Sequence, residues 1–149
     1  VMDPLIEAVV QKGQDGLAFT YGVTNAGKSY TMLGTKTDPG LIPQSIETLS
    51  NSLSAEDELS LGYMEVYNDD LNDLLPMDST KTELRIRERD GATELQGLSR
   101  HRVSSMKEGI QLLTKGDRMR KTNSTKLNKA SSRSHCVCSL ELIRKSKGK

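Results

Sequence analysis

The sequence predicts an α/β layered fold, because stretches with helical and with strand periodicity alternate along the chain. Apolar residues recur at helical spacing within residues 5–10, 42–53 and 105–113. Alternating or continuous apolar runs typical of strands occupy residues 17–21, 59–67, 84–88 and 136–143. A chain of 149 residues has the length of one domain in which helices pack on a sheet.

The first third of the chain predicts three helices separated by glycine-containing segments. The first helix is expected to break at residues 13–16, and the apolar run at 17–21 is expected to form a short strand that ends at glycine. A second helix is predicted to begin at Lys28 and to be interrupted by the loop at 34–40. Pro43 fits the first turn of the third helix, where its missing N–H does no harm.

The middle of the chain predicts strands and turns. Residues 59–67 carry apolar side chains on both faces, as in a strand that is covered on both sides. Residues 68–75 are expected to form a short helical piece that Pro76 ends. Residues 84–88 alternate as an exposed strand does, and Asp90-Gly91 is a turn signal.

The last third predicts a helix, a polar loop and a strand. Ser105 and Glu108 have capping-box spacing, which predicts a helix that runs to about Arg120. Residues 121–134 lack periodicity and are expected to form a polar loop. The following alternating segment is expected to be a central strand.

The composition narrows the class of protein. No apolar stretch approaches the roughly 18 residues of a membrane-spanning helix, which disfavours a transmembrane protein and a signal peptide. A net charge of +1 excludes a uniformly basic nucleic-acid binder. Acidic residues concentrate in 54–80 and basic residues in 115–129, which is explained either by solvated surfaces or by an acidic partner.

The two cysteines are interpreted as core thiols. Cys136 and Cys138 lie two residues apart, so they share one face of the predicted strand and do not readily bridge each other. His135 alone does not complete a metal site with them. Unpaired thiols of this kind are typical of a reducing compartment.

Residues 22–29 match the phosphate-loop pattern G-x-x-x-x-G-K-[ST] in full. Gly22 and Gly27 allow the backbone to curl so that successive N–H groups face phosphate oxygens. Lys28 supplies a positive charge for the β- and γ-phosphates, and the Ser29 hydroxyl is suited to Mg²⁺. A glycine-rich turn without nucleotide is disfavoured, because the pattern lies between a predicted strand and a predicted helix.

A second polar cluster ends the predicted loop. Asn128, Ser131, Ser132 and Arg133 offer an amide, two hydroxyls and a fixed cation, which are groups that phosphoryl transfer uses for positioning and charge stabilisation. Taken alone, the cluster is better explained as a serine-rich loop without a catalytic role.

Three segments together resemble the kinesin motor domain. Phe19-Thr-Tyr-Gly-Val-Thr-Asn-Ala-Gly-Lys-Ser-Tyr-Thr-Met32 is similar to the family's phosphate loop, and Asn128-Lys-Ala-Ser-Ser-Arg-Ser-His135 to its switch I, N-x-x-S-S-R-S-H. The segment at 61–75 is similar to the family's strand-and-turn segment S-x-x-E-I-Y-N-E-x-x-x-D-L-L. The resemblance covers nearly the whole chain in the family's order.

The resemblance implies an incomplete motor domain of the phosphate-loop NTPase type, with a central, mostly parallel β-sheet flanked by helices. It implies that residues 1–149 run from the phosphate loop through switch I and the following strand. It also implies that ATP and Mg²⁺ are bound. The cofactor-binding residues would be Gly22, Val23, Thr24, Asn25, Ala26, Gly27, Lys28, Ser29 and Tyr30, with Tyr30 beside the adenine.

In switch I, the resemblance implies that Asn128, Ser131 and Ser132 order the γ-phosphate, the attacking water and Mg²⁺. Ser29 and Ser132 would be the Mg²⁺ ligands. Arg133 would pair with a glutamate of the family's switch II. The switch II pattern D-x-x-G-S-E does not occur in these residues, and the sequence begins with Val, so the chain is expected to be a fragment that is inactive alone.

The implied partner is the microtubule, whose acidic surface Arg100 and Arg102 would approach from one face of a strand; solvated surface charges are the alternative. The implied location is the cytoplasm and its cytoskeleton, without nucleic acid or membrane. Val23 departs from the family, in which many members carry Gln. The Gly-Val-Thr-Asn form is similar to the kinesin-6 branch and residues 84–135 to the kinesin-10 branch, so the branch stays open.

Three functions follow from these patterns. The first is an ATP-hydrolysing microtubule motor, and the second is a non-hydrolysing kinesin-like module that binds nucleotide and a partner without movement. The third, an unrelated phosphate-loop kinase or GTPase, is disfavoured by the switch I octet.

Overall fold

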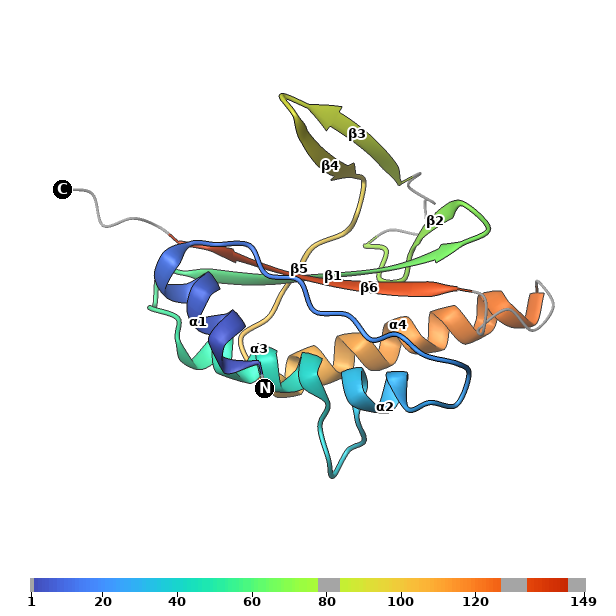
Figure 1. Cartoon of the computed structure of the whole chain (residues 1–149), viewed down its shortest axis with the longest axis horizontal. Helices are drawn as coiled ribbons and strands as arrows, with labels where there is room; N and C mark the ends of the chain where they lie inside the picture. Colours follow the sequence, from blue (N-terminus) through green and yellow to red (C-terminus); the bar gives the residue numbers. More distant parts are fainter. Residues whose placement is uncertain (1, 78–83, 127–133, 145–149) are drawn as a thin grey trace. The chain divides into compact units, whose positions relative to one another are not determined.

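The computed structural model of the chain describes residues 2–77, 84–126 and 134–144 (Figure 1). Its helices are α1 (Asp3–Lys12), α2 (Lys28–Leu33), α3 (Leu41–Asn51) and α4 (Met106–Lys126). Its strands are β1 (Glu58–Tyr67), β2 (Asp70–Asp73), β3 (Arg85–Arg89), β4 (Ala92–Gln96), β5 (His101–Arg102) and β6 (His135–Ile143).

The chain divides into two compact units. The first consists of Val1–Leu59, Val103–Gly109 and Leu142–Lys149, and the second of Ser60–Arg102 and Ile110–Glu141. Each unit is described by itself below.

Three of the predicted helices form the first unit, in which α3 packs against α1 and α2. The helix ends lie where the glycines predict, because Gly13 follows α1 with a φ of +62° and Gly34 follows α2 with a φ of +72°. Ile46 of α3 is completely buried. A Cβ atom at Gly109 would lie 2.5 Å from the Cδ1 atom of Ile46, so a glycine at this position allows the close packing.

The strand predicted at residues 17–21 is wrong, because the structure has no regular secondary structure there. The side chains of Leu17, Phe19 and Tyr21 are 83%, 79% and 96% exposed. An apolar run becomes a strand only when a neighbouring strand accepts its backbone hydrogen bonds, and none of the described strands pairs with this segment.

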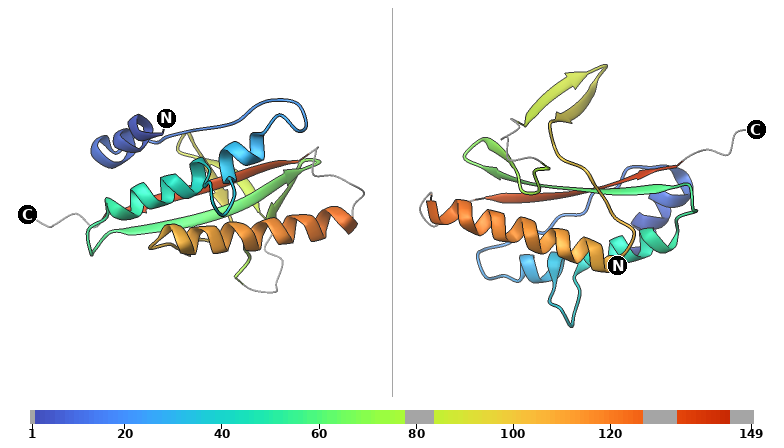
Figure 2. Two further views of the ribbon diagram at one scale, coloured as in Figure 1. Left: turned by 90° about the horizontal axis from the view of Figure 1, so that it is seen from below. Right: turned by 180° about the vertical axis from the view of Figure 1, so that it is seen from behind.

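Strand β1 is the centre of the second unit, and it pairs with β2, β5 and β6. Its side chains are buried on both faces from Leu59 to Tyr63, as the sequence predicts. Within this unit, α4 runs along one face of the β1–β6 pair, and the β3–β4 hairpin projects from the opposite side (Figures 1 and 2).

The helical piece predicted at residues 68–75 is also wrong. The chain instead turns at Asn68 and Asp69, which have φ values of +51° and +65°, and β2 returns antiparallel along β1. Two successive residues with positive φ define a hairpin turn of the type that Asn and Asp tolerate. The pair Asn68-Asp69 is therefore a turn signal in the sequence, which the helical prediction overlooked.

The mostly parallel sheet stays a prediction. The register is defined for the pairs β1–β2, β1–β5 and β3–β4, and all three of these pairs are antiparallel. The predicted exposed strand and the turn after it are confirmed, because β3 is exposed and pairs with β4 around Asp90 and Gly91, which have φ values of +53° and +79°.

Helix α4 is longer than predicted. It extends to Lys126, so the polar loop expected from residue 121 is wrong for 121–126, and residues 127–133 lie outside the described part of the chain. Extending a helix that is already formed costs little free energy. Polar residues can therefore continue the helix without a buried apolar stripe. Leu113, Gly116 and Arg120 follow one another at spacings of three and four, so they share a face.

One glycine lets α4 pack closely on the sheet, and one serine caps the start of the helix. A Cβ atom at Gly116 would lie 2.5 Å from the ring of Tyr63 in β1, so the missing side chain lets the helix approach the sheet closely. At the start of α4, the Glu108 amide donates to the Ser105 hydroxyl over 3.3 Å, as in the predicted capping box. The Glu108 carboxylate also accepts hydrogen bonds from the amide and hydroxyl of Ser104, each over 2.8 Å.

Replacing Ser105 with alanine is expected to lower the free energy of unfolding by about 1 kcal/mol, because the Glu108 amide loses its capping acceptor. Urea denaturation of the chain measures this loss. Ser54→Ala is the matched control, since Ser54 is exposed and uses its backbone N–H to bind Asp57. Equal stability of the Ser105→Ala variant and the wild type would contradict the cap.

Strand β6 carries both cysteines as free thiols on one face, as predicted. Burial raises the pKa of the Cys138 thiol to about 12, so this residue stays protonated at neutral pH. Among residues 2–77, 84–126 and 134–144, no three His, Cys, Asp or Glu side chains are grouped to hold a metal ion. No described helix is long and apolar enough to cross a membrane.

Candidate functional site

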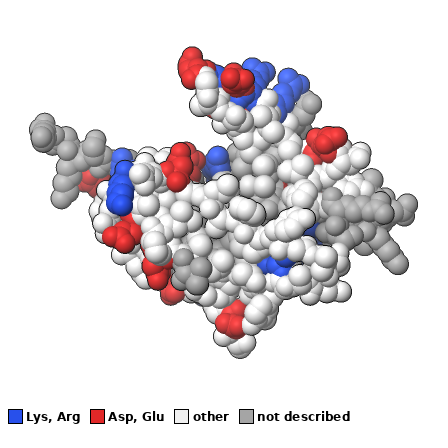
Figure 3. All heavy atoms as spheres, in the orientation of Figure 1, with Lys and Arg blue, Asp and Glu red and all other residues white. Residues whose placement is uncertain are grey.

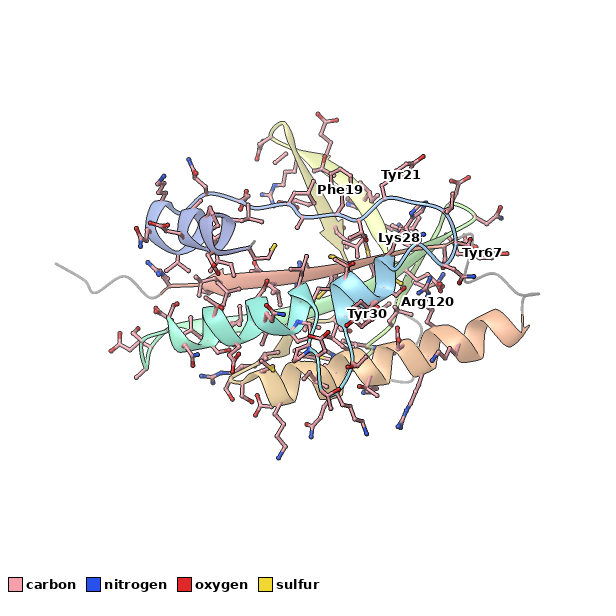
Figure 4. All side chains as sticks on the ribbon, turned by 60° about the horizontal axis from the view of Figure 1, so that its bottom comes forward. Phe19, Tyr21, Lys28, Tyr30, Tyr67 and Arg120 are labelled. Carbon is pink, nitrogen blue, oxygen red and sulfur yellow. The ribbon has the colours of Figure 1, made fainter. Side chains whose placement is uncertain are left out.

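Residues 22–27 of the predicted phosphate loop form an exposed turn that leads directly into α2, whose first two residues, Lys28 and Ser29, complete the pattern (Figure 4). The Ala26 amide donates to the Val23 carbonyl over 3.2 Å and closes the turn. Asn25 and Gly27 have φ values of +67° and +89°, which curl the backbone as an anion-binding loop requires. A Cβ atom at Gly27 would meet nothing within 4 Å, so glycine is favoured there by conformation rather than by space.

Lys28 turns back over this loop. Its ammonium group donates to the carbonyl oxygens of Gly22 and Val23, each over 2.6 Å. Both acceptors are neutral, and a charged phosphate oxygen is a stronger partner for an ammonium group than a carbonyl is. The lysine is therefore held at the loop in a place from which it can transfer its bonds to an anion.

The donors at this loop are of the kinds that suit phosphate groups and Mg²⁺. Backbone N–H groups and the Lys28 ammonium suit phosphate oxygens, and the exposed Ser29 hydroxyl suits a hard cation. Because α2 has only six residues, its dipole adds little, and the fit depends on the loop and Lys28.

Tyr30, predicted beside the adenine, lies on α2 and is 55% exposed (Figure 4). Its hydroxyl donates to a carboxylate oxygen of Asp38, and this hydrogen bond raises the pKa of the Tyr30 phenol. The bond joins α2 to the loop at 35–40. Tyr30 is thus bonded to a loop that the sequence did not connect to the site.

The predicted switch I residues Asn128, Ser131, Ser132 and Arg133 lie outside the described residues. The octet's next residue, Ser134, is described, and its hydroxyl accepts a hydrogen bond from the Nη2 atom of Arg120 over 2.7 Å.

Arg120 belongs to a buried polar cluster in the second unit. Its Nε atom lies 3.0 Å from Glu65 Oε1, and the two side chains are only 18% and 8% exposed. Nearby, the Tyr63 hydroxyl donates to Asp117 over 3.4 Å. Burial raises the pKa of the Tyr63 phenol, and neighbouring Cys136 and Asp117 raise it further, so the phenol stays neutral.

The two arginines expected to face tubulin have different environments. The Arg100 guanidinium donates to the Ser139 hydroxyl and lies 3.4 Å from the Glu141 carboxylate. Arg102 is exposed on β5, opposite Ser60 of β1. Only Arg102 belongs to the strand, because β5 begins at His101.

The sequence matches the model of the kinesin motor domain over residues 1–149. The chain belongs to the kinesin motor domain family. Curated relatives agree with this assignment. The kinesin-like protein KIN-8B of Arabidopsis thaliana is 40% identical over 98% of this chain, and the human kinesin-like protein KIF19 is 37% identical over 97%. The kinesin-like protein KIP3 of Saccharomyces cerevisiae is 33% identical over 97%.

This kinesin chain spans less than a fifth of the length of these relatives, at 18%, 15% and 18% of KIN-8B, KIF19 and KIP3. The solved structure "Structure of a fast kinesin: Implications for ATPase mechanism and interactions with microtubules" superposes with a TM-score of 0.83 and 30% identity. The match covers 95% of this chain and 42% of that one. The fold is therefore the kinesin type of phosphate-loop NTPase, and the branch stays open.

Two features of this kinesin chain escaped the sequence analysis. The Glu65–Arg120 pair joins residues 55 positions apart, although a glutamate inside a two-sided apolar strand was a signal that a buried partner exists. In the exposed hairpin, Arg85, Arg87 and Arg89 alternate along β3 and therefore share a face. Figure 3 shows basic and acidic side chains together on this hairpin.

Proposed function

We propose that the chain is the ATP-binding part of a kinesin-like motor that couples ATP hydrolysis to movement along microtubules. The observation that carries the proposal is the phosphate loop, in which Lys28 is held over the carbonyls of Gly22 and Val23. Within a kinesin motor domain, this loop would receive the β- and γ-phosphates of ATP. The expected place of action is the microtubule cytoskeleton in the cytoplasm.

We further propose that the chain supplies the part of the motor from the phosphate loop through switch I and the following strand. Gly22–Ser29 would bind the phosphates, and Tyr30 would contact the base. Asn128, Ser131 and Ser132 would order the γ-phosphate and the attacking water, while Arg133 would close the switch. When bound through Ser29 and Ser132, Mg²⁺ would neutralise charge on the phosphates.

Calorimetry with Mg·ATP and ATPase assays test this function. The chain is expected to bind Mg·ATP, and the full-length protein is expected to hydrolyse ATP faster when microtubules are added. The 149 residues alone are expected to hydrolyse little ATP, because the switch II pattern does not occur in them. A full-length protein that binds Mg·ATP but hydrolyses none would favour the non-hydrolysing module instead.

The partner surface is proposed to include Arg100 and Arg102. Replacing both with alanine in the full-length protein is expected to raise the microtubule concentration for half-maximal ATPase about two- to fivefold, since exposed charges contribute up to about 1 kcal/mol. Arg102→Ala alone is expected to give most of the effect, because Arg100 is engaged with Ser139 and Glu141.

The salt dependence of microtubule stimulation is expected to flatten in the double variant, because long-range attraction between exposed charges is screened by salt. Lys12→Ala on α1 is the control, since it removes an exposed positive charge elsewhere. A double variant with wild-type half-maximal concentration at low salt would show that this surface does not contact the microtubule.

A further inference from the structure

The packing of α4 on β1 places two pairs of residues opposite each other. Gly116 of α4 lies against the ring of Tyr63, and Arg120, one helical turn later, meets Glu65, two residues later in β1. Four residues of a helix span about 6.0 Å and two residues of a strand span about 6.7 Å. Both pairs of residues can therefore lie opposite each other. The close contact between Gly116 and Tyr63 therefore helps to place Arg120 opposite Glu65.

The Arg120 guanidinium uses two different edges. Its Nε atom bonds the Glu65 carboxylate over 3.0 Å, and its Nη2 atom donates to the Ser134 hydroxyl over 2.7 Å. A planar guanidinium has its five donors in a rigid arrangement, whereas a lysine ammonium is a point charge on a flexible stem. Glu65 itself is 6% exposed and belongs to the central strand, so it is a firm anchor.

We propose that Arg120 is a positioning residue for ATP hydrolysis, because it ties Ser134, the residue that directly follows the switch I Arg133, to Glu65 of the central strand. This inference rests on the proposed motor function. Ser134 directly follows Arg133 and lies two and three residues after Ser132 and Ser131. The bond from Arg120 therefore holds the described end of the switch I octet at the central strand.

This tie acts on turnover more than on ATP affinity. The phosphate loop carries its own donors for the phosphates, whereas ordering of the water and closing of the switch are required for the reaction itself. Loss of the Ser134 bond alone leaves the Glu65–Arg120 ion pair in place, so the fold keeps its buried charge compensated.

A double-mutant cycle in the full-length protein tests the tie. Ser134→Ala is expected to lower kcat about tenfold, with the KM for ATP and the affinity for Mg·ATP within about twofold of the wild type. Ser134→Thr keeps the hydroxyl and is expected to restore kcat. Arg120→Lys is expected to lower kcat similarly, and the double variant Ser134→Ala/Arg120→Lys no further, since both changes break the same bond.

Thr114→Ala is the matched control, because it removes an exposed hydroxyl bond to the Ile110 carbonyl on the same helix. Hydrogen exchange gives a second readout: amides of residues 131–135 are expected to exchange faster in Ser134→Ala and at the wild-type rate in Thr114→Ala. If Arg120→Lys does not fold, the Ala and Thr variants of Ser134 still decide the question.

The outcomes separate this inference from the function on which it rests. Wild-type protein that hydrolyses ATP, together with unchanged kcat in Ser134→Ala or strictly additive effects in the cycle, would overturn the positioning role alone. Wild-type protein that neither binds nor hydrolyses Mg·ATP would overturn the motor function and the positioning role with it.

Discussion

Replacing Lys28 with alanine is expected to weaken Mg·ATP binding by about 1.5–3 kcal/mol, which corresponds to a loss of roughly 10- to 150-fold in affinity. The ammonium group makes charge-assisted bonds to phosphate oxygens, and no other basic side chain lies within the eight residues of the loop pattern. Calorimetric titration of the chain with Mg·ATP measures the effect.

Two control variants separate this contact from general charge. Lys36→Ala removes an equal charge from the exposed loop that follows α2, and it is expected to leave the affinity within about twofold. Lys28→Arg keeps the charge, but its planar head fits the two carbonyls of Gly22 and Val23 less well, so an intermediate loss is expected.

Removal of Lys28 also removes its bonds to the loop carbonyls, so the loop itself changes in the variant. Circular dichroism and urea denaturation show whether the rest of the chain is intact. An intact Lys28→Ala variant with wild-type affinity would mean that the ammonium group does not contact the nucleotide, and the phosphate-loop assignment would fail.

Local signals predicted most of the elements correctly. Helices α1 and α3 follow from apolar spacing, and α2 lies between glycine-containing segments as predicted. Strand β3 and its turn follow from alternation before Asp90-Gly91. These features depend on neighbours a few residues apart, which a sequence displays directly.

The errors at residues 17–21 and 68–75 both concern strand pairing, which the composition of a segment does not show by itself. Residues 17–21 have the composition of a strand, yet a strand also needs a partner in space. Residues 68–75 return along β1 because the turn at Asn68 and Asp69 directs them there, and a helical interpretation overlooked that turn.

The candidate site also has a part that the sequence predicts and a part that it does not. The phosphate loop is a contiguous pattern, so all of its residues could be named from the sequence. The contacts of Tyr30 with Asp38 and of Arg120 with Glu65 and Ser134 depend on tertiary packing, which sets distances that residue spacing does not encode.

The Glu65–Arg120 pair is expected to dominate the stability of the second unit. Replacing Arg120 with leucine leaves a carboxylate with an 8% exposed side chain without its cation, and it is expected to lower the free energy of unfolding by roughly 3 kcal/mol or more. Urea denaturation of the chain, fitted with a common slope, measures the loss.

The reciprocal and double variants identify the cause. Glu65→Leu is expected to cost less than Arg120→Leu, because the longer arginine side chain, already 18% exposed, can turn its head toward water. The double variant Glu65→Leu/Arg120→Leu is expected to recover much of the lost stability, since no uncompensated charge stays buried and two apolar side chains replace the pair. Arg102→Leu, at an exposed site on β5, controls for the loss of an arginine.

Recovery in the double variant would also separate folding from turnover. Such a protein would be stable without the Arg120 guanidinium, so the hydroxyl of Ser134 would lose its donor while the unit stayed folded. Its ATPase in the full-length protein is then expected to be as slow as that of Ser134→Ala. A double variant no more stable than Arg120→Leu would mean that the cost comes from lost packing around α4 rather than from an uncompensated buried charge.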